Sequence, residues 1–230
     1  MNNQTFLEWF RDDYVFDYQG SSDLVSGMYF DDWWPESGPF PDPFPNMTED
    51  MGLTPEEQKR ISKSYQANMK VIYDEMLRRG KFTWQQMWNG QDDPSTKNGC
   101  CTSPIVRNET CAASLRKYCA ADSPSQTRVM SYAFSPGSCD GGKGLVNLTS
   151  PKHDIANFLL IRGPQAFLGH GWLGCSRIYT YPDELTWDYG EPLGLCEETS
   201  SGVFVREWTN AVVKMDCNTW TPTIDMKKKN

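Results

Sequence analysis

Two adjacent carboxylates, Asp31 and Asp32, directly follow the short apolar run Leu24 to Phe30. That run is rich in aromatic and aliphatic residues, which is typical of a buried strand. Ligands of α/β folds bind at the carboxyl ends of strands, so acids at this point are placed for nucleophilic or acid–base chemistry. Neighbouring strand residues point to opposite faces, so one acid reacts and the other braces it or caps a turn. The alternative is that both acids belong to a loop and cap backbone amides.

A carboxylate that acts as a nucleophile or base often works with a second carboxyl group, which protonates the leaving oxygen or activates water. Several acids at later strand ends are candidates for this role: Asp92, Asp93, Asp140, Asp188 and Glu191. We choose Glu191. The end of the second predicted strand offers only the amides Gln85 and Gln86, which cannot act as acid or base.

Aromatic side chains gather near the same predicted strand ends, and sugar rings stack on such faces. We therefore predict a catalytic set and a substrate-binding set: Asp31, Asp32 and Glu191 for catalysis, and Trp33, Trp34, Trp84, Gln85, Trp88, His170, Trp172 and Tyr189 for binding. The alternative for the aromatic residues, Trp187 among them, is packing in the core or in loops. The alternative for His170 is an ordinary structural histidine.

Composition excludes several classes of protein. The net charge of −8 disfavours binding to nucleic acid or to an anionic membrane. No apolar stretch approaches the roughly 18 residues of a transmembrane helix. Neither a G-x-S-x-G motif nor a phosphate-binding loop is present, since Gly141 to Gly144 lacks the required spacing. We expect no cofactor.

The eight cysteines favour disulfides over metal, because no C-x-x-C pair and only two histidines occur. Cys111 and Cys119 lie too far apart on one predicted helix to bond each other. Cys100 and Cys101 are their nearest partners in sequence, and Cys175 with Cys196 is a plausible pair. Four N-x-S/T sequons also favour a secreted protein: Asn3, Asn46, Asn108 and Asn147. Residues 1–16 lack the apolar core of a signal peptide.

Helices and strands are predicted to alternate along the chain. Helical spacing or capping predicts helices over 4–16, 54–80, 110–121 and 150–163, and apolar runs predict strands over 24–30, 81–88, 128–134 and 166–168. This alternation is typical of parallel βα units. The tail differs, because residues 203–208 and 211–216 flank Thr209-Asn210 and predict a β-hairpin.

The run from Gly27 to Trp34 resembles the fourth-strand region of glycoside-hydrolase-like (β/α)8 barrels. Residues 188–194 and 202–208 are similar to the closing segment of the same proteins. The resemblance implies that this chain, as a single domain over 1–230, forms the C-terminal part of a TIM-like barrel, with βα units over about 4–200 and a closing hairpin over about 202–217. It also implies that Asp31 is the nucleophile. An open sheet is the alternative fold.

Three hypotheses about function follow. The first is a secreted glycoside hydrolase that acts on a polysaccharide or oligosaccharide through Asp31 and a second acid. The second is a non-catalytic carbohydrate-binding protein, and the third is an inactive fragment. A carboxyl pair about 5–10 Å apart would favour the enzyme.

Overall fold

The computed structural model describes residues 4–30, 51–89, 111–127, 129–134, 145–146, 151–169, 178–179 and 181–228. The chain divides into two compact units, Met1–Gln86 and Met87–Asn230. The prediction of a single domain over 1–230 stays a prediction. Within the described ranges, no helix combines the length and the apolar character that crossing a membrane requires.

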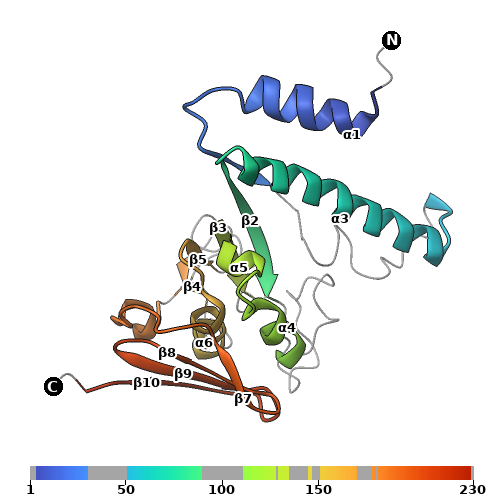
Figure 1. The fold of residues 1–230 in the computed structure, drawn as a ribbon. Helices are drawn as coiled ribbons and strands as arrows, with labels where there is room; N and C mark the ends of the chain where they lie inside the picture. Colours follow the sequence, from blue (N-terminus) through green and yellow to red (C-terminus); the bar gives the residue numbers. More distant parts are fainter. Residues whose placement is uncertain are drawn as a thin grey trace. The chain divides into compact units, whose positions relative to one another are not determined.

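The described residues of the first unit form helices and a pair of parallel strands (Figure 1). Its elements are α1 (Phe6–Glu8), the π-helix η1 (Trp9–Gln19), β1 (Gly27–Phe30), α3 (Pro55–Arg78) and β2 (Phe82–Asn89). Each element lies where the sequence predicts a helix or a strand. A small core joins the helices: Val15 and Phe16 pack with Ile72 and Met76. The guanidinium of Arg79 lies 4.1 Å from the Phe16 ring centroid.

The helix α3 begins as its sequence predicts. Thr54 is the N-cap, and its hydroxyl accepts a hydrogen bond from the Glu57 amide at 3.3 Å. The Glu57 carboxylate in turn accepts from the Thr54 amide at 2.9 Å. The pKa of Glu57 lies below its usual value, because the charged carboxylate accepts hydrogen bonds from both the amide and the hydroxyl of Thr54. Pro55 occupies the first turn, where a missing amide hydrogen costs nothing.

We expect Thr54→Ala to lower the free energy of unfolding by about 1 kcal/mol, because the Glu57 amide loses its acceptor. Thr54→Ser keeps the hydroxyl and should stay close to the wild type. The measurement is urea denaturation followed by circular dichroism. Equal midpoints for the alanine and serine variants would show that the cap does not contribute.

The second unit contains short helices and several strands. Its elements are α4 (Cys111–Tyr118), α5 (Pro124–Thr127), β3 (Val129–Phe134), β4 (Leu145–Val146), α6 (Pro151–Ile161), β5 (Ala166–Gly169), β6 (Ile178–Tyr179), the 3-10 helix η3 (Asp183–Thr186), β7 (Glu197–Ser200), β8 (Val203–Glu207), β9 (Ala211–Asp216) and β10 (Thr221–Met226). The described strands of this unit include the parallel pairs β3 with β5 and β4 with β6.

The strands β7 to β10 form an antiparallel sheet in the order β10-β9-β8-β7. Figure 1 shows α6 beside this sheet. Side chains that point inward from the sheet and side chains of α6 share one core: Ile155, Ala156, Phe158, Leu159, Leu160, Ile161, Phe204, Trp208, Ala211, Val213, Met215 and Ile224. The outer face bears exposed polar groups such as Lys214 and Asp225. The sheet therefore has one buried face and one face toward water, as antiparallel sheets commonly do.

Two disulfides attach α4 to this sheet. Cys111 bonds Cys217 after β9, and Cys119 bonds Cys196 before β7, with Cα separations of 5.5 and 5.3 Å. The prediction that Cys111 and Cys119 take partners elsewhere is confirmed, but these partners are Cys217 and Cys196 and not the neighbouring Cys100 and Cys101. The suggested pair of Cys175 with Cys196 is wrong, because Cys196 bonds Cys119.

The predicted (β/α)8 barrel is also wrong. The described strands include a four-stranded antiparallel sheet and a two-stranded parallel sheet, β4 with β6, and they form no barrel. The predicted hairpin is present as β8 and β9, but β7 and β10 extend it on both sides. Alternation of helices and strands predicts parallel pairing between neighbours. It does not determine whether a sheet closes on itself, which depends on long-range pairing.

Candidate functional site

Three aromatic side chains lie on one face of the parallel pair formed by β1 and β2. Tyr29 and Trp84 are register partners, and their ring centroids lie 5.2 Å apart in an edge-on arrangement. Phe82 precedes Trp84 by two residues and so lies on the same face of the strand. About two fifths of each residue is exposed: 46% for Tyr29, 40% for Phe82 and 39% for Trp84. We call these three side chains the aromatic platform.

The opposite face of the same strands is turned inward. Thr83 is fully buried, and its register partner Met28 packs against the small core of the first unit. Gly27 lies under the Phe82 ring, since a Cβ at Gly27 would come within 2.5 Å of that ring. A larger residue at position 27 would therefore displace the Phe82 ring. The buried face fixes the strands, and the platform faces solvent.

The platform includes one residue of the predicted binding set and two that sequence reasoning missed. Trp84 was predicted, whereas Tyr29 and Phe82 were assigned to strands without a role in binding. The alternation of side chains along a strand places positions 27 and 29 on one face, and likewise positions 82 and 84. Gln85 and Trp88 belong to β2, and the structure describes only their backbone.

Six predicted site residues lie outside the described residues: Asp31, Asp32, Trp33, Trp34, His170 and Trp172. The same is true of Asp92, Asp93 and Asp140, three candidates for the second acid. Their assignments stay predictions. Within the described ranges, no group of three or more histidine, cysteine or acidic side chains could hold a metal ion.

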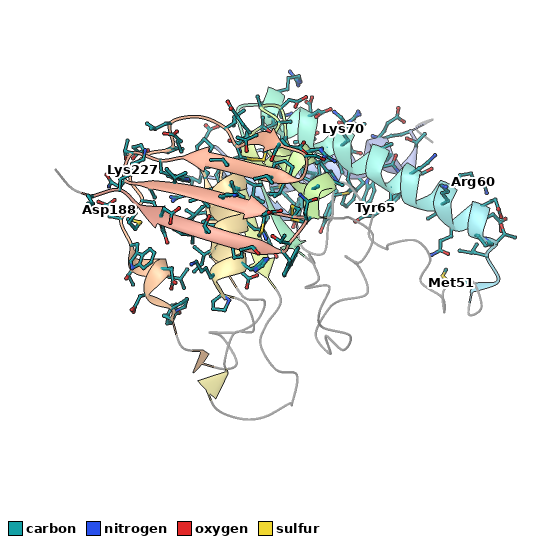
Figure 2. All side chains as sticks on the ribbon, turned by 90° about the horizontal axis from the view of Figure 1, so that it is seen from below. Met51, Arg60, Tyr65, Lys70, Asp188 and Lys227 are labelled. Carbon is teal, nitrogen blue, oxygen red and sulfur yellow. A yellow bond between two sulfur atoms is a disulfide. The ribbon has the colours of Figure 1, made fainter. Side chains whose placement is uncertain are left out.

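Glu191 and Asp188 belong to a segment that is hydrogen-bonded to the turn after β8. The Glu191 amide donates to the Thr209 hydroxyl, and the Thr209 amide donates to the Glu191 carbonyl, both at 2.9 Å. The Asp188 carboxylate accepts from the Gly190 amide at 3.1 Å. The Asn210 carbonyl accepts a hydrogen bond from the Lys227 amide, and the Asn210 side-chain amide donates to the Asp188 carbonyl. Figure 2 shows Asp188 and Lys227 at the same end of the antiparallel sheet. The described contacts of Glu191 are backbone contacts that hold this turn.

Tyr189 has a structural role in the same segment. The residue is buried, its hydroxyl donates to the Glu184 carbonyl, and its carbonyl accepts from the Asn210 amide. Burial, with the nearby charge of Glu184, raises the pKa of Tyr189 to about 12. A side chain that is buried and bonded to its own segment is poorly placed to bind a ligand. The prediction of Tyr189 as a binding residue gains no support from these contacts.

We expect Tyr189 to ionise near pH 12, well above an ordinary tyrosine. The folded state disfavours the phenolate form of Tyr189. The neutral phenol therefore contributes its full stabilisation below about pH 10, and this stabilisation disappears as the pH rises through 12. The difference in tyrosinate absorbance between the wild type and Tyr189→Phe isolates this group. A difference titration centred near pH 10 would contradict the described environment.

Comparison with known proteins adds no relative to this description. No protein-family model matches the chain. No curated protein is significantly similar to it. Any function must therefore be inferred from the residues of this chain.

Proposed function

We propose that this protein is a secreted carbohydrate-active protein that holds a sugar ring against the aromatic platform and hydrolyses a glycosidic bond beside it. The observation that favours this function is the platform itself, with Tyr29, Phe82 and Trp84 half-exposed on one strand face. The C–H groups of a sugar ring pack well against aromatic faces, and the rigid strands hold those faces in place.

The proposed nucleophile is Asp31. Asp31 is the acid nearest in sequence to the platform residue Tyr29, which it follows by two residues. This spacing favours Asp31 over Asp32 as the carboxylate that acts on a sugar held by the platform. A second acid must protonate the leaving oxygen.

Secretion is part of the proposal. Two disulfides connect residues far apart in the second unit, and such bonds form and persist in oxidising compartments. The four sequons agree with the same route.

The first test is binding of oligosaccharides from a broad panel of plant, algal and fungal polysaccharides. We expect Trp84→Ala to weaken the best ligand about fivefold to tenfold, because an aromatic contact contributes about 1 kcal/mol. Trp84→Phe should retain most of the affinity. Trp187→Ala is a matched control, since Trp187 lies in the second unit and is similarly exposed, at 37%. Equal loss in both alanine variants would contradict a site on the platform.

The second test is hydrolysis of the same panel by the wild type and by Asp31→Asn. We expect the variant to lose activity by at least about 100-fold, because its amide is neither a nucleophile nor a base. Asp23→Asn is the control, an exposed aspartate in the same unit. Equal activity in the wild type and Asp31→Asn would remove Asp31 from the mechanism.

The second candidate function is carbohydrate binding without catalysis. It is favoured by the described contacts of Glu191, which are with the turn at Thr209 and not with another carboxylate. Binding that depends on Trp84, with no hydrolysis of any member of the panel, would establish this second function.

A further inference from the structure

A second set of exposed aromatic rings lies on the N-terminal helix formed by α1 and η1. Phe6, Phe10, Tyr14 and Tyr18 follow each other at intervals of four residues, with ring centroids 6.0, 5.6 and 6.1 Å apart. Trp9 lies beside this row, 5.7 Å from Phe6. We call these five rings the helix aromatic face.

Most of this face is turned away from the core. Phe6 is 76% exposed and Tyr18 is 75% exposed, while Trp9 and Tyr14 are each 43% exposed. Burial occurs on the other side of the helix, where Val15 and Phe16 pack against α3. Phe10 is partly buried against this core. The more exposed rings of Phe6, Trp9, Tyr14 and Tyr18 form a candidate surface for binding.

The charges around the row restrict what can bind there. Residues 4–30 contain five acidic side chains and one basic side chain, and that single Arg11 is paired with Asp12 at 2.6 Å. Asp13 and Asp17 are exposed, and each immediately precedes a ring of the row, Tyr14 and Tyr18. An anionic polysaccharide, a nucleic acid or an anionic membrane would be repelled. A second copy of this helix would bring like charges together, which is unfavourable.

We propose that the helix aromatic face binds a polysaccharide that bears free ammonium groups, which is a polymer of amino sugars. The rings stack against the sugar faces and attract the ammonium groups through cation–π contacts. The carboxylates of Asp13 and Asp17 accept hydrogen bonds from the same ammonium groups. This inference rests on the proposed function, since it names the class of carbohydrate, and it adds a surface separate from the aromatic platform.

The experiment compares two probes of equal length on the full-length protein by titration calorimetry. One probe is a β-1,4-linked glucosamine hexamer, and the other is its N-acetylated form, which lacks the positive charge. We expect the glucosamine hexamer to bind at least about tenfold more tightly, and we expect this advantage to shrink at high salt. Acetylation removes the charge while it keeps the sugar faces, so the difference isolates the ammonium groups.

Variants of the exposed positions locate the site. We expect the double variant Asp13→Asn/Asp17→Asn to lose most of the preference for the glucosamine hexamer. We also expect the double variant Phe6→Ala/Tyr18→Ala to weaken binding about tenfold. The control is Asp183→Asn/Asp225→Asn, which removes two exposed charges from the second unit and should bind as the wild type does. Circular dichroism of each variant confirms that the helices are retained.

The outcomes separate this inference from the proposed function. Equal affinity for both hexamers, or equal effects of the two aspartate double variants, would overturn the inference. If the glucosamine hexamer fails to bind while another glycan binds in a manner that depends on Trp84, the inference fails and the proposed function stands. If no glycan of either set binds, both fail. A change in sedimentation caused by Phe6→Ala/Tyr18→Ala, without any change in glycan binding, would assign the face to a second copy and overturn the inference.

Discussion

Arg206→Met is expected to destabilise the second unit by about 4 kcal/mol, because the buried guanidinium of Arg206 donates hydrogen bonds to carbonyls at the C-terminal end of α6. The residue is only 3% exposed. Its Nη1 donates to the carbonyls of Leu159, Leu160 and Arg162, and its Nε donates to the Gly194 carbonyl at 2.8 Å. The last carbonyls of a helix have no partner within the helix, and they bear its partial negative charge.

Methionine fills similar space but has no donor, so the buried carbonyls of Leu159 and Leu160 lose the guanidinium that they share with the Arg162 carbonyl. The measurement is guanidinium denaturation followed by tryptophan fluorescence, which reports on Trp208 beside the guanidinium, 5.1 Å away. Lys214→Met is the control, because Lys214 lies exposed on the outer face of the same sheet. Its effect should stay within about 0.5 kcal/mol. A loss of less than about 1 kcal/mol for Arg206→Met would contradict the role of Arg206 as a helix cap.

Removal of the disulfide between Cys119 and Cys196 is expected to lower the free energy of unfolding by about 4 kcal/mol. The two cysteines are 77 residues apart, so reduction releases a long loop and increases the entropy of the unfolded chain. The helix α4 has only 8 residues and is too short to be stable alone. Leu115 and Tyr118 attach it to the core, and the two disulfides attach both of its ends.

The variant for this test is Cys119→Ala/Cys196→Ala, which leaves no unpaired thiol at this pair. Thermal unfolding in the absence and presence of a reductant gives the size of the effect. Peptide mapping of the wild type should recover Cys119 linked to Cys196 and Cys111 linked to Cys217. A peptide in which Cys175 is linked to Cys196 would contradict the described pairing. Equal unfolding of the variant and the wild type would show that the bond does not stabilise the fold.

The candidate site could be predicted only in part. The sequence placed Trp84 on a strand next to the acidic strand end, and the structure places Trp84 in the aromatic platform. Tyr29 was missed because a tyrosine within an apolar run looks like a core residue until the exposed face of the strand is known. Tyr189 was included because it lies in a motif with a family resemblance. Its burial and its bond to the Glu184 carbonyl depend on packing that no local pattern reveals.

Edge strands explain much of the difference in fold. The strand β7 has the sequence Glu-Glu-Thr-Ser and is exposed throughout, so it has no alternation of apolar and polar residues. The strand β10 contains Pro222, which ordinarily argues against a strand and is tolerated at an edge. Short, charged or proline-containing edge strands protect a sheet from pairing with another chain. The same residues disrupt the alternation of apolar and polar positions, so the sequence pattern does not predict these strands.

Local patterns in the sequence predict many of the helices and strands of this protein. The capping residues Thr54 and Glu57 predict where α3 begins, and apolar runs predict β1, β2, β3 and β5, because these signals depend on neighbours within a few residues. Long-range contacts determined which cysteines pair, that β7 and β10 extend the predicted hairpin to a four-stranded sheet, that Arg206 is buried, and that the rings of Phe6 and Tyr18 are exposed. Each of these depends on contacts between residues far apart in the chain, and a local pattern contains no information about them.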